Sequence, residues 1–452
     1  MRSLRDVVDR EAVGALVLTA AIPFLFIHER FQAEYSLALG SATIDLRLSD
    51  AAILAVLTAA AVFAARRGIG RFSTGRAVWL PGIALLAWLA FETLRPVSLD
   101  DPRFEDNVVS ALKLGEYALL APAVPLLIRR VEDLAILIVG LVLWSSVATA
   151  VAVVQFFGLD IFAASSAGWR YPSFLGRHDL AAISALATCL AAAAVIVGRR
   201  WVPGRGLFTL ALVAGVLGLI LAGSVTAAAG LAIGVSALGL VARSRYSPSG
   251  RKLLALAAIV AVVAGGVTAI RSEALDDFLQ FVGIREDRET PGVESYSQRT
   301  VLAYIGLRIF EDSPVLGVGW QRSSRPDAFE PYLDDARRRF PDVNPLAFPA
   351  AGREWGVQNL YIQMLADSGV IGLVLLLAVG VGGLVLARRT AAHASNPWAA
   401  GAGLTVVGAL LTLAGVWASL GIVPGIPLQA ATCLLLGLAA AGAATVEEAT
   451  GG

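Results

Sequence analysis

The chain has 452 residues, of which 57% are hydrophobic and only 16% are charged, and its formal net charge is +1. Soluble globular domains are about a quarter charged, so this composition excludes an ordinary soluble domain and indicates lipid as the solvent. A net charge this close to zero gives no general attraction to polyanions, and we expect no nucleic acid among the partners.

Apolar segments of about 18–25 residues recur along the chain, long enough to cross a hydrocarbon core of roughly 30 Å as helices. Their approximate bounds are 12–27, 49–65, 78–94, 108–128, 133–157, 179–198, 206–222, 225–242, 253–270, 357–387, 398–420 and 426–445. They lack the alternation of a membrane β-barrel. The predicted fold class is therefore all-α, a polytopic transmembrane bundle of about 12 spans. The segment 357–387 is overlong, so its start lies above the bilayer or the helix tilts.

Basic residues are concentrated in five of the short connections. With twelve spans, all five lie on the side of the N-terminus, and the positive-inside rule makes that side cytoplasmic. We predict a bacterial inner-membrane protein with both termini in the cytoplasm. The residues concerned are Arg66, Arg67, Arg71, Arg76, Arg129, Arg130, Arg199, Arg200, Arg205, Arg243, Arg245, Arg251, Lys252, Arg388 and Arg389.

One long polar segment interrupts the apolar pattern. It divides the chain into residues 1–270 with helices 1–9, an insert at 271–356, and residues 357–452 with helices 10–12. The insert is partly helical by its pattern, with an amphipathic stretch near Arg299–Phe310. Connections of this length are usually functional or disordered, and its aromatic content favours an ordered extracytoplasmic cap.

Motifs for several kinds of chemistry are absent from the sequence. There is no nucleotide-binding P-loop, no His-Glu-x-x-His helix and no Gly-x-Ser-x-Gly elbow. Cys189 and Cys433 lie in separate apolar segments, so we predict no metal and no cofactor. Charges inside the spans are few: Lys113 and Glu116 are spaced to pair across a helix turn, and Glu92 lies near an outer helix end.

Three arginines of the outer connections are candidates for binding a phosphate group. Arg170 and Arg177 flank a Pro/Gly turn, and Arg299 begins the amphipathic stretch of the insert. A guanidinium group stays charged and donates two parallel hydrogen bonds, which suits a phosphate or diphosphate. The alternative is that these arginines bind lipid headgroups or the carboxylates of nearby loops.

Two outer residues are candidates for an acid or base. His178 follows Arg177 at a helix start, and Glu354 lies just before an apolar segment resumes. The simpler interpretations are an interfacial or helix-capping histidine and a solvated loop glutamate. Asp179 at a helix start is more typical of an N-cap than of a catalytic acid.

Two stretches that bracket the insert carry a resemblance. The first runs from Ser297-Gln298-Arg299-Thr300 to Ser313-Pro314-Val315-Leu316-Gly317-Val318-Gly319-Trp320, and the second is Gln358-Asn359-Leu360-Tyr361-Ile362-Gln363-Met364-Leu365-Ala366-Asp367-Ser368-Gly369. In this order and topology the pair resembles the O-antigen ligase and O-antigen polymerase superfamily of bacterial membrane glycosyltransferases. The Tyr171–Ala182 stretch is also similar to that family's turn between spans five and six.

The resemblance implies a metal-independent, inverting glycosyltransferase of the ligase or polymerase type. It would move a glycan from an undecaprenyl-diphosphate carrier to a hydroxyl of a glycan or lipid acceptor at the outer face, with membrane lipids around it. Such a transfer needs cations for the leaving diphosphate and a base for the hydroxyl. Arg170, Arg177 and Arg299 fit the first role.

The chain departs from the family pattern at two places. Gln358 stands where the family has histidine, and an amide cannot take a proton at physiological pH. Val225 follows Ser224 where the family commonly has a Ser-Arg pair. Either His178 or Glu354 substitutes as the base, or Gln358 only orients the acceptor, or the reaction differs. The other functions that these departures leave open are a transporter or flippase of a lipid-linked or anionic solute and a non-catalytic envelope-assembly protein.

The glycosyltransferase hypothesis makes a geometric demand. Arg170, Arg177 and Arg299 must converge on one outward site, with Gln358 within reach.

Overall fold

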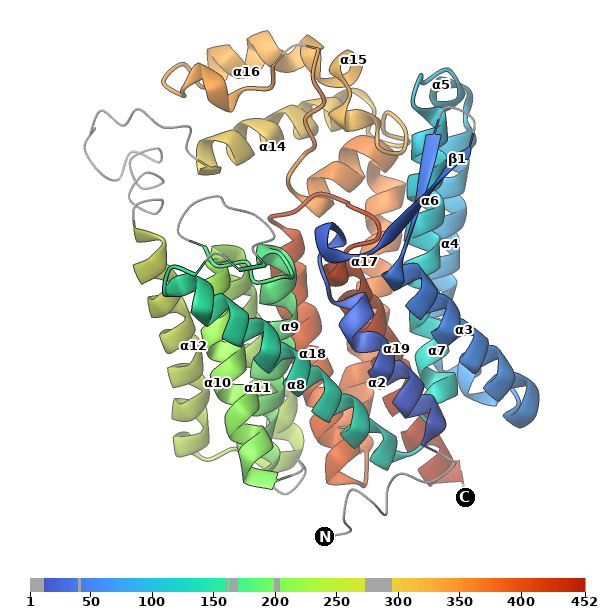
Figure 1. Cartoon of the computed structure of the whole chain (residues 1–452), viewed down its shortest axis with the longest axis vertical. Coiled ribbons are helices and arrows are strands. Elements are labelled where there is room, and N and C mark those ends of the chain that lie inside the picture. The colour runs from blue at the N-terminus through green and yellow to red at the C-terminus, as the bar shows by residue number, and fades with distance from the viewer. Residues whose placement is uncertain are drawn as a thin grey trace.

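The computed structural model describes residues 12–39, 42–159, 161–162, 170–198, 204–272, 295–350 and 352–451. In this part of the chain eleven helices are long and apolar enough to cross a bilayer. The first apolar segment forms a shorter helix, α2 (Val13–Leu25). These twelve helices match the predicted segments to within a few residues and confirm a polytopic all-α bundle (Figure 1).

The other elements follow in chain order. They are β1 (Glu34–Leu39), β2 (Ala42–Arg47), α3 (Leu48–Arg67), α4 (Arg76–Leu94), α5 (Pro96–Leu99), α6 (Phe104–Ala118), α7 (Leu120–Leu127), α8 (Val131–Phe156), α9 (Arg177–Val197), α10 (Gly204–Ala222), α11 (Val225–Tyr246), α12 (Gly250–Ile270), α14 (Ser295–Asp312), α15 (Pro326–Phe329), α16 (Leu333–Arg339), α17 (Leu360–His393), α18 (Pro397–Trp417) and α19 (Pro427–Gly451). The sequence pattern did not predict the antiparallel β1–β2 hairpin.

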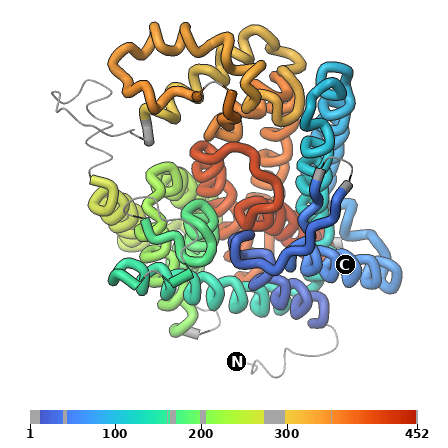
Figure 2. The backbone as a smooth tube through the Cα atoms, turned by 45° about the horizontal axis from the view of Figure 1, so that its top comes forward, coloured from blue at the N-terminus to red at the C-terminus, as the bar shows by residue number. Residues whose placement is uncertain are grey.

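Helices α17–α19 stand between two groups of helices, α9–α12 on one side and α3–α7 on the other (Figure 2). Small residues let the central helices approach closely, because association in lipid depends on packing rather than on the hydrophobic effect. A Cβ atom at Gly234 of α11 would lie 2.3 Å from the carbonyl oxygen of Gly408 in α18. Most of the side chains of α9 are buried, so its first turn is fixed in the centre of the molecule.

The part of the insert that the structure describes from Ser295 onward packs as a small layer at one end of the bundle, opposite the start of α2 and the end of α19 (Figure 1). Val301, Ile305 and Ile309 repeat every four residues on one face of α14 and bury themselves against Phe329 and Leu333. The predicted amphipathic stretch therefore has its own hydrophobic core.

A clasp closes the base of the segment that holds α15 and α16. The backbone N–H of Trp355 donates to the carbonyl of Ser324 at 3.0 Å. Next to it, the Arg325 guanidinium forms an ion pair with Glu354. The two ends of this segment therefore leave the rest of the protein side by side.

Helix α17 is broken at Gly369, which explains the length of the predicted segment. Gly369 has φ 64°, and a Cβ atom there would lie 2.1 Å from the carbonyl oxygen of Val315. The break exposes the carbonyl oxygens of Ala366 and Asp367, which accept hydrogen bonds from the N–H groups of Val318 and Gly319 at 2.9 and 2.8 Å. The two stretches that bracket the insert are thus joined backbone to backbone.

Several of the basic connections meet at the end opposite the insert. Arg71 bonds Glu448 in α19 and donates to the carbonyl of Ile128 after α7, while Arg389 pairs with Glu447 at 2.8 Å. The connections after α3, α7 and α17 therefore share one end with the close of α19. Of the predicted basic residues, Arg199 and Arg200 lie outside the described residues.

Candidate functional site

The turn that carries Arg170 and Arg177 is held by two neighbours, one in α8 and one in α10. The N–H of Tyr171 donates to the carbonyl of Leu221 at the end of α10, at 3.1 Å. Gln155 of α8 accepts from the N–H of Ser173 at 2.8 Å. These bonds fix the turn between α8 and α10, so the two arginines at its ends have defined positions.

The three predicted arginines converge on His178. Arg177 Nε donates to His178 Nε2 at 3.1 Å. The positive charges of Arg170, Arg177 and Arg299 all act on the imidazole of His178, which is buried in the first turn of α9. Residues from the α8–α9 turn and from the insert therefore surround one side chain.

Gln358 lies within reach of this group. Arg299 Nε donates to the Gln358 side-chain oxygen at 3.1 Å. The contact is possible because α14 lies close to the start of α17: a Cβ atom at Gly306 would lie 2.8 Å from Ile362. The geometric demand of the glycosyltransferase hypothesis is met for Arg299 and Gln358.

A fourth arginine, not predicted from the sequence, joins the group. Arg271 follows the last residue of α12, and its side chain packs beside that of Arg170 over Gly223. Its charge also acts on Arg177. We call these four arginines the site cluster: Arg170, Arg177 and Arg299, which act on His178, and Arg271, which lies beside Arg170.

The candidate bases are placed differently. The lone pair of His178 Nε2 accepts the hydrogen bond from Arg177, so that nitrogen can take a proton only if Arg177 moves. Glu354 accepts from Arg103 at 2.7 Å with both oxygens and also pairs with Arg325. The structure therefore puts His178 in the site cluster, whereas the contacts of Glu354 lie with α6 and the insert.

Most polar residues of the second stretch hold the fold together. Asn359 accepts from the N–H groups of Tyr361 and Ile362 and caps α17. Gln363 accepts from the N–H of Ile422 at 2.7 Å. Asp367 accepts from the N–H of Ser323 at 2.8 Å. Of this stretch, Gln358 is the residue that contacts the site cluster.

The remaining predicted charges have structural partners. Asp179 accepts from the N–H of Leu428 at 2.7 Å and so caps α19 rather than its own helix. The pairing of Lys113 with Glu116 is confirmed at 3.6 Å, and Glu92 pairs with Arg95 at 3.0 Å. Within the described residues no group of three or more His, Cys, Asp and Glu side chains lies together in a way that could hold a metal.

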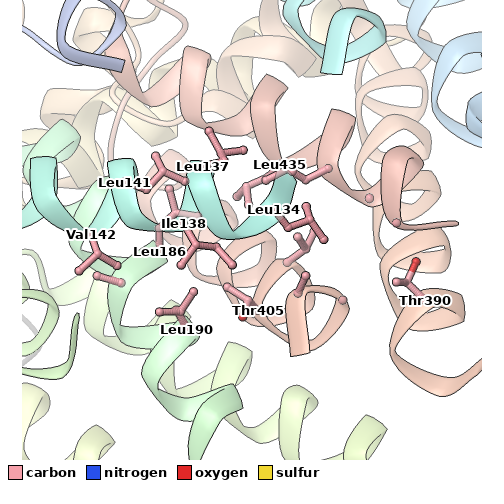
Figure 3. Close-up of a pocket in the computed structure, with 17 residues that line it drawn as sticks. Leu134, Leu137, Ile138, Leu141, Val142, Leu186, Leu190, Thr390, Thr405 and Leu435 are labelled. Atoms are coloured by element: carbon pink, nitrogen blue, oxygen red, sulfur yellow. The ribbon is translucent and has the colours of Figure 1, made fainter. Parts of the chain in front are cut away.

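Two apolar cavities lie inside the bundle. One of about 50 Å³ is enclosed by α8, α9, α18 and α19 and is lined almost wholly by aliphatic side chains (Figure 3). The hydroxyls of Thr390 and Thr405 on its wall donate to their own helices. A cavity with such walls is a packing void rather than a site for chemistry.

The second cavity is larger, about 620 Å³, and lies between α4, α7, α17 and α18. Its lining is also apolar and includes Leu360 and Tyr361 in the first turn of α17. It therefore reaches the helix turn that follows Gln358.

Comparison with known families agrees with this geometry. Residues 209–377 match the family model described as O-antigen ligase. No curated protein matches the chain. The matched segment runs from α10 into α17 and contains Arg271, Arg299 and Gln358, together with both stretches that bracket the insert. Family and apolar helices together indicate an integral membrane protein with an O-antigen ligase-type role in envelope polysaccharide assembly. Over residues 209–377 the chain is therefore similar to the O-antigen ligase family.

Proposed function

We infer that the protein transfers a glycan from an undecaprenyl-diphosphate carrier to a hydroxyl of a glycan or lipid acceptor. The observation that carries this proposal is the convergence of Arg170, Arg177 and Arg299 around His178, with Gln358 bonded to Arg299. Several guanidinium groups at one point suit a diphosphate, because its many oxygens accept paired, charge-assisted hydrogen bonds.

The reaction exchanges one bond for another at the anomeric carbon. The acceptor oxygen forms a bond to that carbon while the bond to the diphosphate oxygen breaks, and the carrier leaves as a diphosphate anion. The site cluster stabilises the negative charge that develops on this leaving group. The hydroxyl proton passes to a base, and no metal takes part in the step.

His178 is the candidate base that fits this arrangement best. It lies among the arginines and has a nitrogen that can take a proton, whereas Gln358 has none. When the diphosphate binds, Arg177 turns its N–H from His178 Nε2 to a phosphate oxygen, which frees the lone pair. Gln358 then orients the acceptor hydroxyl. Glu354, held by Arg103 and Arg325, would have to break ion pairs to act.

The membrane arrangement supports a lipid-linked substrate. The basic connections gather at one end of the bundle, and the insert lies at the other. The positive-inside rule places the insert, residues 271–356, outside as a cap over the site. The large apolar cavity beside Leu360 and Tyr361 offers room for part of a hydrocarbon chain next to the charged group.

The test is transfer by the purified protein from a lipid-diphosphate-linked glycan. Arg299→Ala should lower the transfer rate at least about 100-fold, because it removes charge-assisted bonds worth roughly 3 kcal/mol. Arg308→Ala is the matched control, since Arg308 lies on the same helix and pairs with Glu311 at the surface. Equal transfer rates for the wild type and Arg299→Ala would show that Arg299 takes no part in the transfer. Carrier binding without any transfer would favour a flippase or a non-catalytic assembly protein.

A further inference from the structure

The side chain of Arg271 packs over Gly223, the residue of the α10–α11 turn that has no side chain. Gly223 in that turn has φ 60°, a conformation that favours glycine. A Cβ atom on Gly223 would lie 3.2 Å from Cγ of Arg170 and 3.5 Å from Cδ of Arg271. The aliphatic stems of the two arginines therefore pass together over bare backbone, which brings their charged groups into one region.

Two of the guanidinium groups in this region, those of Arg177 and Arg271, face each other without an acid between them in the described part of the chain. Arg177 and Arg271 act on each other as like charges. Within the residues that the structure describes, neither forms an ion pair, and the buried Nε of Arg271 has no hydrogen-bond partner. Buried like charges are unfavourable unless an opposite charge joins them. The arrangement is therefore suited to an anion with several acceptor oxygens.

The position of Arg271 in the chain is also unusual. It directly follows the last residue of α12, at the end of the helix that leads into the insert. Helix α11 begins directly after this turn, and neither Ser224 nor Val225 at its start carries a positive charge. A guanidinium from α12 reaches this turn instead.

We propose that Arg271 is a fourth binding residue for the diphosphate of the lipid carrier, supplying from α12 the positive charge that Val225 does not supply at the start of α11. This inference rests on the proposed function. It gives the α12 end of the insert a direct part in substrate binding, beside Arg170 and Arg177.

The test is binding of farnesyl diphosphate to the full-length protein in detergent, followed by calorimetry. Arg271→Gln should raise the Kd about tenfold, the effect of one lost charge-assisted contact. Arg251→Gln is the control, because Arg251 is exposed at the other end of the same helix. Adding Val225→Arg to Arg271→Gln should restore most of the affinity.

The outcomes separate this inference from the proposed function. An unchanged Kd in Arg271→Gln, with binding lost in Arg299→Ala, would overturn the role of Arg271 and leave the glycosyltransferase proposal standing. Absence of binding in the wild type would instead count against the diphosphate site as a whole.

A measurement on the wild type tests the proposal even if the Arg271→Gln variant fails to fold. Phenylglyoxal modifies accessible arginines, and mass spectrometry reads the rate at each one. Farnesyl diphosphate should slow the modification of Arg271 and leave that of Arg251 unchanged. Equal rates at Arg271 with and without the ligand would contradict the proposal.

Discussion

Two groups of arginines lie at the end of the molecule that carries the insert, and they differ in their partners. In the first, here called the paired cluster, guanidinium groups meet carboxylates; its members are Arg95, Arg103, Arg322 and Arg325 with Glu92, Asp101, Asp106, Asp327 and Glu354. In the site cluster, Arg177 contacts His178 and Arg271 contacts the Gly223 turn, and neither of these two forms an ion pair within the described residues.

The difference separates an arginine used for structure from one kept for a ligand. A buried guanidinium that already has a carboxylate is neutralised and holds two elements together. One that lacks a carboxylate keeps its charge available, at a cost to stability, and is suited to an anionic substrate. Arginine thus has two roles in this protein, and the groups that contact each guanidinium decide which role it takes.

The largest expected effect is on the chemistry of the site cluster. His178→Asn should lower the transfer rate by about a thousandfold, because general base catalysis is lost. Farnesyl diphosphate should still bind to this variant. Stopped transfer with retained binding would assign His178 to the proton step.

A second substitution checks that assignment. In the His178→Asn background, Gln358→His places an imidazole within reach of Arg299 and should restore part of the rate. The restored rate should rise with pH, because the neutral imidazole is the form that accepts a proton. A rate in His178→Asn equal to that of the wild type would rule out His178 as the base.

The next effect is on stability in the paired cluster. Arg325→Ala leaves the buried carboxylate of Asp101 with Arg322 alone, at 3.5 Å, and should reduce the free energy of unfolding by about 3 kcal/mol. Denaturant unfolding in detergent measures the change. Arg337→Ala, whose pair with Asp334 is exposed, is the control. Similar stability in both variants would mean that the paired cluster does not hold the cap.

A smaller effect is expected at the backbone under the site cluster. Gly223→Ala introduces a side chain at φ 60° against the stems of Arg170 and Arg271, which should cost about 1 kcal/mol of stability. Diphosphate binding should weaken several-fold as the two stems are pushed apart. Calorimetry on Gly223→Ala and on the exposed Gly250→Ala distinguishes this local effect from a general glycine effect.

The smallest effect tests the exposed edge of the paired cluster. Arg103 is half-exposed, and so are its partners Asp106 and Glu354, so solvent screens the pair. Arg103→Ala should change the free energy of unfolding by less than about 1 kcal/mol. A loss of stability as large as that of Arg325→Ala would contradict the argument that solvent exposure weakens the ion pairs of Arg103.

The sequence was sufficient for the parts of the fold that depend on local composition. Helix positions follow from the length of apolar segments, and the break at Gly369 accounts for the overlong segment. Arg170, Arg177 and Arg299 were found because arginine near an outer helix end is noticeable by itself. Glu354 was a candidate base or a solvated loop glutamate by its position, whereas its partners Arg103 and Arg325 could not be seen in the local pattern.

Other features depend on contacts that no local pattern contains. Arg271 resembles an ordinary interfacial arginine until α12 packs it against Gly223. The β1–β2 hairpin carries the alternation of a strand in Thr43-Ile44-Asp45-Leu46, which was overlooked beside the long apolar segments, although Tyr35 and Leu37 of β1 are exposed. The roles of Gln363 and Asp367 as links to Ile422 and Ser323 likewise appear only after folding.

The clasp at the base of the α15–α16 segment has a consequence for how specificity can change. Because Ser324 and Arg325 meet Trp355 and Glu354, the residues between them form a loop with joined ends, within which Phe329 and Leu333 pack against α14. Replacement of 326–353 by a segment of another length would leave the joint between α17 and the insert intact. Recombination at these two points, with Phe329 and Leu333 kept, is therefore a route by which the surface of this layer could be exchanged.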